Sequence, residues 1–293
     1  LYYYHENGAV PKDLYVFVAP ESGSSTLHVI DSSAGPNIDV LTVGHAVTKN
    51  FLLRKPSNQG VILDLLPGGP PLERFSLQRL EGAAGNVDLR VVDGGPVDVT
   101  VLSVPAGSAP ADGAASGPVL PDDTHHRTGI FSLDGYADDT VAFRVDGPDA
   151  SLLYGAQSPP AAQANPNWHD FGEYGVLRHL TLEIDNPSGA RSVVYVYEQP
   201  EGGVIRSSFL LDGTLHELGC ARVPQKYLIA QLVVSDKHER HTVLTMTDGG
   251  SSYPVEVGLT MQQPNLVTPP ISGPDGCFPK PQPSPAATAS PGI

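Results

Sequence analysis

Glycine and proline are the residues that most constrain how this chain can fold. The sequence contains 31 glycines and 29 prolines among its 293 residues, about one residue in five. Inside a helix, glycine costs about 1 kcal/mol and proline about 3 kcal/mol relative to alanine. A chain this rich in both residues favours short strands joined by turns over long helices. We therefore expect a turn-rich β protein.

The pattern of apolar residues indicates where the strands lie. Apolar and polar residues alternate at 97–101 and at 180–184, which places the apolar ones on one face of a strand. Helical periodicity of comparable length is not found. Further strands are predicted at 14–18, 26–30, 61–66, 87–92, 141–145, 193–197, 227–234, 242–247 and 255–260.

Asp-Gly pairs mark the turns between these strands. Both residues tolerate the positive φ that a tight hairpin requires. Short strands separated by such turns predict an all-β fold of two antiparallel β-sandwich domains, immunoglobulin-like or jelly-roll-like. The pairs begin at Asp93, Asp134, Asp146, Asp212 and Asp248.

A change in composition divides the chain into domains. The stretch PAGSAPADGAASGPVLP at 105–121 has almost nothing to bury. We predict an N-terminal β-sandwich at 1–104, a Gly/Ala/Pro-rich linker and polar loop at 105–127, and a C-terminal β-sandwich at 128–263. A long loop at 157–167 interrupts the second sandwich, and a proline-rich tail occupies 264–293.

The charge and the chain start bear on partners and compartment. The net charge of −15 repels phosphate backbones, so we expect no nucleic acid as a partner. The longest apolar runs fall short of the roughly 20 residues of a membrane span. The first residues lack a signal peptide, and no Asn-x-Ser/Thr glycosylation site occurs. We expect an exported bacterial protein, secreted or on the cell surface, whose signal peptide has been removed.

The only two cysteines are Cys220 and Cys277. They are candidates for a disulfide that closes a long loop, which in a secreted protein stabilises by about 3–4 kcal/mol. The alternative is two unrelated buried thiols.

One polar cluster is a candidate metal site. Asp122, Asp123, His125 and His126 lie together before the second sandwich. The imidazoles suit zinc or copper, the carboxylates suit calcium, and such a centre would support a metal-dependent hydrolase. The alternative is a solvated loop, because adjacent residues rarely all point at one ion.

An acidic turn is a candidate calcium site. Asp134, Asp138 and Asp139 supply carboxylates close together, although their spacing is not that of an EF-hand. We expect the protein to need no cofactor, with calcium at this turn as the one exception, and a solvated turn is the alternative.

The aromatic stretch at 168–175 is a candidate glycan-binding site. Trp168, His169 and Tyr174 combine flat rings with polar groups, and rings of this kind stack on sugars. The alternative is an aromatic plug beneath the preceding loop. The N-terminal aromatic run at 2–5 is expected to pack on a sheet or against a neighbouring subunit.

Some of these segments resemble an uncharacterised family of secreted bacterial proteins found in cyanobacteria. The resemblance rests on Phe171–Leu177, Leu180–Ile184, Asn186-Pro-Ser188 and, near the start, Tyr4-His5-Glu-Asn7. It covers about a third of the chain, implies an exported β-sandwich and assigns no functional residue.

The sequence contains no nucleophile elbow, phosphate loop or dinucleotide motif. We therefore expect a non-enzymatic structural or adhesive protein of the bacterial cell surface or of an extracellular assembly, filaments included. Such a protein would self-associate through strand edges or termini. A carbohydrate-binding module and a metal-dependent hydrolase are the alternatives.

Overall fold

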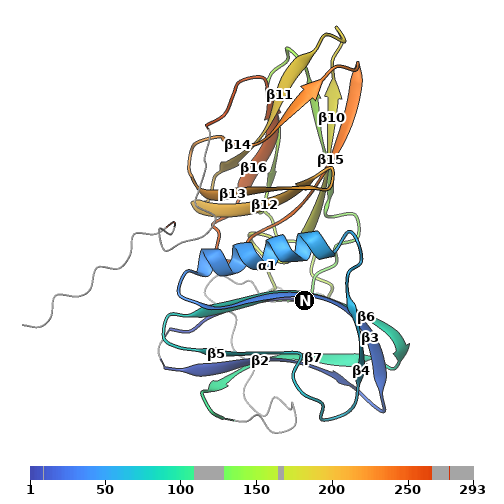
Figure 1. Cartoon of the computed structure of the whole chain (residues 1–293), viewed down its shortest axis with the longest axis vertical. Coiled ribbons are helices and arrows are strands. Elements are labelled where there is room, and N and C mark those ends of the chain that lie inside the picture. Colours follow the sequence, from blue (N-terminus) through green and yellow to red (C-terminus); the bar gives the residue numbers. More distant parts are fainter. Residues whose placement is uncertain (9, 109–128, 164–167, 266–276, 278–293) are drawn as a thin grey trace, which may run out of the picture.

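The computed structural model describes residues 1–8, 10–108, 129–163, 168–265 and 277. Within these residues the chain forms four β-sheets and one α-helix. The sheets pair into two sandwiches, one above and one below the helix in Figure 1, which confirms the predicted all-β fold. The predicted linker from residue 109 onward and most of the proline-rich tail lie outside the described residues.

The first sandwich packs a four-stranded sheet on a three-stranded sheet. The four-stranded sheet has the order β1 (Tyr2–Glu6), β6 (Gly82–Gly94), β3 (Ser25–Asn37) and β4 (Val61–Leu65). The facing sheet has the order β5 (Glu73–Leu77), β2 (Lys12–Pro20) and β7 (Val97–Pro105). Their shared core contains Leu14, Val16, Leu27, Val29, Leu77 and Val87.

The second sandwich packs a five-stranded sheet on a four-stranded sheet. The larger sheet has the order β13 (Thr214–Arg222), β12 (Val204–Leu211), β15 (His238–Met246), β10 (Leu177–Asp185) and β8 (Asp138–Arg144). The smaller has the order β14 (Tyr227–Val234), β11 (Ser192–Pro200), β16 (Val255–Thr260) and β9 (Ala150–Tyr154). The alternation predicted at 180–184 is confirmed, because Leu180, Leu182 and Ile184 all face the core.

One strand pair differs from the antiparallel pairing that the sequence predicted. β8 pairs with β10 in parallel. Between these two strands the chain passes through β9 in the opposite sheet, and a crossover of this kind allows the two strands to run in the same direction.

The helix α1 (Val40–Arg54) was not expected, so the prediction of no long helix was wrong for this segment. Asp39 caps its N-terminus by accepting a hydrogen bond from the backbone N–H of Thr42. α1 contacts β3 and β6 on one side and β12 on the other. Because both sides are buried, the segment lacks the single apolar stripe by which a surface helix is recognised.

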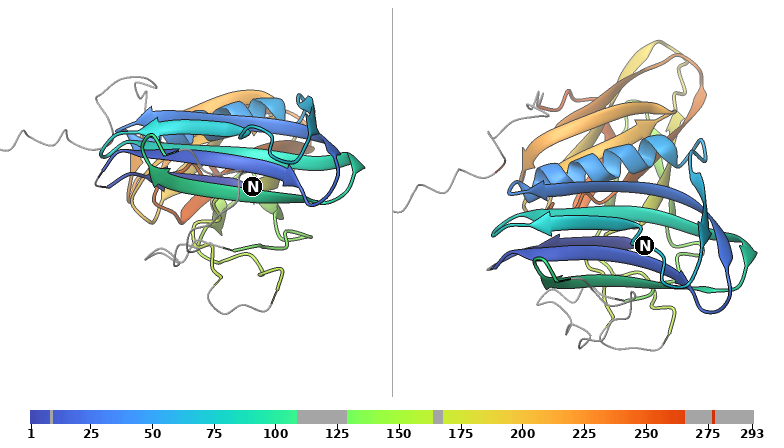
Figure 2. Two further views of the ribbon diagram at one scale, coloured as in Figure 1. Left: turned by 90° about the horizontal axis from the view of Figure 1, so that it is seen from below. Right: turned by 60° about the horizontal axis from the view of Figure 1, so that its bottom comes forward.

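The helix therefore forms a layer between the two sandwiches. Figure 2 shows α1 lying along the outer face of the sheet that contains β3 and β6. One apolar cluster crosses this junction and contains Ile30, Phe51, Leu52, Leu210 and Met246. In the described part of the chain, no helix is long and apolar enough to span a membrane.

Turn chemistry behaves as predicted at the β12–β13 hairpin. Asp212 and Gly213 form its two-residue loop, and both have positive φ, at 48° and 78°.

The strand β12 itself was not predicted, because seven of its eight residues are buried and no alternation is left to detect. β5, β9 and β13 were missed as well.

Candidate functional site

The most polar part of the junction is centred on His45 of α1. Its Nδ1 lies 2.7 Å from Oδ2 of Asp248, in the turn after β15. Its Nε2 lies 2.9 Å from Oε1 of Glu217, on β13. Lys49, one helical turn further along α1, places its Nζ 3.2 Å from the same carboxylate oxygen of Glu217. A helix packed on the first sandwich thus contacts two carboxylates of the second.

Burial and charge act in opposite directions on these groups. His45 is 4% exposed and Asp248 is fully buried. Burial alone would lower the pKa of His45, but the carboxylates of Asp248 and Glu217 outweigh it and raise that pKa above its ordinary value. Burial raises the pKa of Asp248 in spite of the nearby imidazole. The geometry therefore favours a protonated histidine held between two acids.

A serine next to this histidine invites comparison with a catalytic triad. Ser208 Oγ lies 3.5 Å from Nδ1 of His45. A general base needs one ring nitrogen free to accept the proton of the nucleophile, while the other is held by an acid. Here each nitrogen of His45 already faces a carboxylate, and Ser208 is fully buried. This arrangement suits holding two domains together and does not suit activating a serine.

The start of α1 makes a second contact with the other sandwich. Nη2 of the buried Arg206, on β12, lies 3.7 Å from Oδ2 of Asp39, the residue that caps α1. In the described part of the chain, Nε and Nη1 of Arg206 have no hydrogen-bond partner. At Gly44 the helix touches the turn after β15, because a Cβ placed there would lie 1.9 Å from the carbonyl oxygen of Gly249. Only glycine allows this approach.

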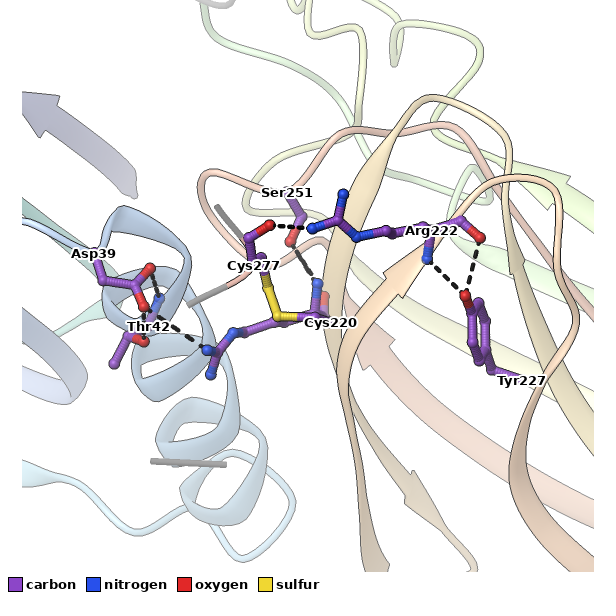
Figure 3. The surroundings of a disulfide bond; sticks show 8 residues. Asp39, Thr42, Cys220, Arg222, Tyr227, Ser251 and Cys277 are labelled. Carbon is purple, nitrogen blue, oxygen red and sulfur yellow. Dashed lines mark hydrogen bonds and ion pairs between the residues drawn. A yellow bond between two sulfur atoms is a disulfide. The ribbon is translucent and has the colours of Figure 1, made fainter. Parts of the chain in front are cut away.

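The predicted disulfide is present. Cys220 on β13 is bonded to Cys277. Figure 3 shows the guanidinium of Arg222 donating a hydrogen bond to the carbonyl oxygen of Cys277. The hydroxyl of Tyr227 accepts from the backbone N–H of Arg222 and donates to its carbonyl oxygen. The disulfide and the hydrogen bond from Arg222 fix Cys277 against the edge strand β13.

The candidate glycan-binding residues lie in one loop, residues 168–174, which we call the aromatic loop. Trp168 and His169 are half-buried, and a Cβ added to Gly129 would collide with Trp168. Tyr174 is buried, and its hydroxyl donates to the carbonyl oxygen of Ser251 at 2.6 Å. The ring that the loop exposes is Phe171, which the sequence did not single out.

Phe171 is 50% exposed and does not stand alone. Its ring stacks on His169, with centroids 5.4 Å apart and an angle of 19° between the planes. The stack holds the exposed Phe171 ring against the half-buried His169. Phe171 lies in the aromatic stretch that the sequence identified, but the sequence does not distinguish an exposed ring from a buried one.

The structure does not test the predicted metal site. Asp122, Asp123, His125 and His126 lie outside the described residues. In the described ranges, no group of three or more His, Cys, Asp or Glu residues is placed to hold a metal ion.

The three aspartates of the acidic turn have separate surroundings. Asp139 forms an ion pair with Arg178, whose Nη2 also lies 2.6 Å from Oε2 of Glu173. Asp138 lies beside His179 across the β8–β10 pair, and Asp134 lies in the turn before β8. Calcium binding at these aspartates stays a prediction.

Sequence reasoning missed the His45 site entirely. His45 stands 172 residues before Glu217 and 203 residues before Asp248. No spacing rule links residues so far apart, and an isolated histidine in an apolar segment carries no signal of its own.

Comparisons with known proteins show no close relative. No family model matches the chain, and no curated protein matches it. A β-glucosidase from Paenibacillus barengoltzii is 9% identical with a TM-score of 0.24, over 45% of this chain and 12% of that one. A lectin from Pleurotus ostreatus, solved in complex with GalNAc, is 11% identical with a TM-score of 0.18, over 87% of this chain and 73% of that one. TM-scores of this size do not indicate a shared fold, so the function of this chain rests on its own residues.

Proposed function

We propose that this chain is a non-enzymatic exported protein with a structural or adhesive role, in which two β-sandwiches act as one rigid body. The observation that carries the proposal is the position of His45, clamped between Asp248 and Glu217 of the other sandwich. The histidine and acids best placed for chemistry are thereby used in holding the domains together.

The apolar part of the junction supports the same role. Phe51 and Leu52 of α1 share a buried cluster with Ile30 of the first sandwich and with Leu210 and Met246 of the second. Domain interfaces within a chain resist relative motion when they are large and hydrophobic. A fixed spacing between two binding or contact surfaces suits a component of a surface layer or adhesin.

The disulfide supports export. A bond between Cys220 and Cys277 persists in an oxidising compartment such as the periplasm or the cell exterior. The bond ties Cys277 to β13, an edge strand of the second sandwich.

Small-angle X-ray scattering combined with sedimentation tests the structural role. We expect one compact two-domain envelope for the wild type, and a broader distribution of sizes for Leu210→Asp, which places a charge in the junction. Leu153→Asp, at an exposed position on β9, serves as the matched control. Free movement of the two domains in the wild-type protein would contradict the proposal, as would a strictly monomeric particle that binds no surface component.

Carbohydrate binding is a second candidate function, favoured by the exposed Phe171 and its stack on His169. Flat exposed rings beside polar groups match the apolar face and the hydroxyls of a sugar. A glycan array with the wild type, Phe171→Ala and the control Leu153→Ala tests it. We expect binding to be lost only in Phe171→Ala, and binding that ignores this substitution would exclude the aromatic loop.

A further inference from the structure

A second polar cluster lies inside the first sandwich, away from the junction. Tyr3 comes from β1, Asp31 and Ser33 from β3, and Glu73 from β5 in the facing sheet. The hydroxyl of Tyr3 donates a hydrogen bond to Oε2 of Glu73. Ser33 interacts with both Tyr3 and Glu73. Four oxygen-bearing side chains from three strands therefore meet between the two sheets.

Two buried oxygens in this cluster have no hydrogen-bond donor among the described residues. Glu73 is only 8% exposed, and its Oε1 is buried with no hydrogen-bond partner among the described residues. Oδ1 of Asp31, a half-buried residue, also has no donor in the described part of the chain. Burial and the contact with the Asp31 carboxyl group raise the pKa of Glu73 to about 8. Carboxylate oxygens only accept hydrogen bonds, so two ionised groups cannot satisfy one another. Such a pair is costly to bury unless something positive lies between them.

In the part of the chain that the structure describes, no positive side chain is recorded between these two carboxyl groups. Among the described residues, the side chains that shift the pKa of the Glu73 carboxyl are Asp31, Tyr3 and Ser33, none of which is a cation. Arg54 of α1 donates to the backbone carbonyl of Asp31. The compensating charge must come from outside the chain, as a metal ion or as a proton.

We propose that Asp31 and Glu73, with the hydroxyls of Tyr3 and Ser33, bind a divalent oxygen-preferring cation, Ca²⁺. Calcium takes 6–8 oxygen ligands and accepts carboxylates, neutral oxygens and water in flexible geometry. The two carboxylates supply the charge, the hydroxyls supply two more oxygens, and water completes the shell. An ion here links the two sheets of the first sandwich, since β3 and β5 lie in different sheets.

Thermal unfolding with and without calcium tests the site. The protein is stripped with EGTA at pH 7.5, and CaCl₂ is then added back in excess. A ligand that binds only the folded state raises the midpoint temperature of thermal unfolding. We expect this temperature to rise by about 5 °C or more when calcium saturates the site. Glu73→Gln and Asp31→Asn should abolish the rise. Asp88→Asn should keep it, because Asp88 pairs with Lys55 outside the cluster.

A proton shared between the two carboxyl groups is the competing explanation, and the same variants separate the two. If the wild type shows no response to calcium and Glu73→Gln is as stable as the wild type, the pair shares a proton and the cation site is overturned. Binding of Tb³⁺, a calcium surrogate, gives a measurement that does not need the variants to fold. We expect Tb³⁺ luminescence excited through tyrosine and displaced by Ca²⁺, and its absence in the folded wild type would also overturn the site.

Discussion

Nδ1 of His45 lies 2.7 Å from Oδ2 of Asp248, and this contact joins a helix packed on the first sandwich to a buried turn of the second. The same imidazole reaches Glu217 through its other nitrogen. A group in this position couples the charge state of one side chain to the docking of two domains. The consequences can be measured.

The stability of the junction should depend on pH. The folded pKa of His45 is raised above its ordinary value of 6.5 by Asp248 and Glu217, against the effect of burial. Protonated His45 therefore contributes stability that is complete below about pH 6.5 and is lost as the pH rises through the raised pKa. Urea unfolding of the wild type at a series of pH values measures this loss.

The double variant His45→Gln/Asp248→Asn is the control for this prediction, because it removes both titrating groups and keeps two polar side chains in contact. We expect the stability of the wild type relative to the double variant to decrease as the pH rises above about 6.5. A difference that stays constant, or that grows with pH, would show that His45 is not held as a cation.

Gly44→Ala should destabilise the protein, although alanine is the better helix former. In an exposed helix, replacing glycine with alanine gains about 0.5–1 kcal/mol. At this position the new Cβ would meet the carbonyl of Gly249 at 1.9 Å, so the helix or the turn must move. We expect a loss of about 1–3 kcal/mol in chemical denaturation. Gly95→Ala, where nothing lies within 4 Å of the added carbon, should change stability by less than about 0.5 kcal/mol.

Removing the disulfide should weaken the second sandwich specifically. The bond closes a loop with a sequence separation of 57, for which chain entropy gives about 4 kcal/mol at 25 °C. We expect Cys220→Ser/Cys277→Ser to lower the urea midpoint of the second sandwich by a corresponding amount. Adding reductant to the wild type should have the same effect and leave the double variant unchanged. Equal stability of the two proteins would refute the prediction.

Arg178→Met should be severely destabilising. The guanidinium is buried, with Nε 2.7 Å from Oε2 of Glu173 and a further ion pair to Asp139. Removing one partner of a buried ion pair leaves the other charge buried without a partner, which costs about 3–5 kcal/mol. Adding Glu173→Gln to Arg178→Met should recover part of the loss. Arg144→Met, at an exposed ion pair, should cost less than about 1 kcal/mol by the same measurement.

The sequence predicted several strands closely. At 180–184 the alternation identified the three core residues of β10, and 227–234 and 255–260 coincide with β14 and β16. It missed the partly exposed strands β5, β9 and β13, and it missed β12 and α1, which are buried on two sides. β12 and α1 lie at the junction between the sandwiches, and contact on two sides removes the polar face that would reveal their period.

Some of the candidate sites could be predicted from the sequence and others could not. Cys220 and Cys277 were predictable as a pair because no other cysteine exists. The aromatic loop was located correctly as a cluster, but whether a ring is exposed depends on its neighbours. Tyr174 turns inward to Ser251, while Phe171 remains at the surface.

By itself, the sequence determined that this chain forms β-sandwiches with tight Asp-Gly turns and a single disulfide. Those features depend on residue type and on neighbours a few positions away. Only the tertiary structure decided that His45 meets Asp248 and Glu217, and that Asp31 meets Glu73 across two sheets. Contacts between residues so distant along the chain are created by the packing of whole sheets and of the helix, and no local pattern records them.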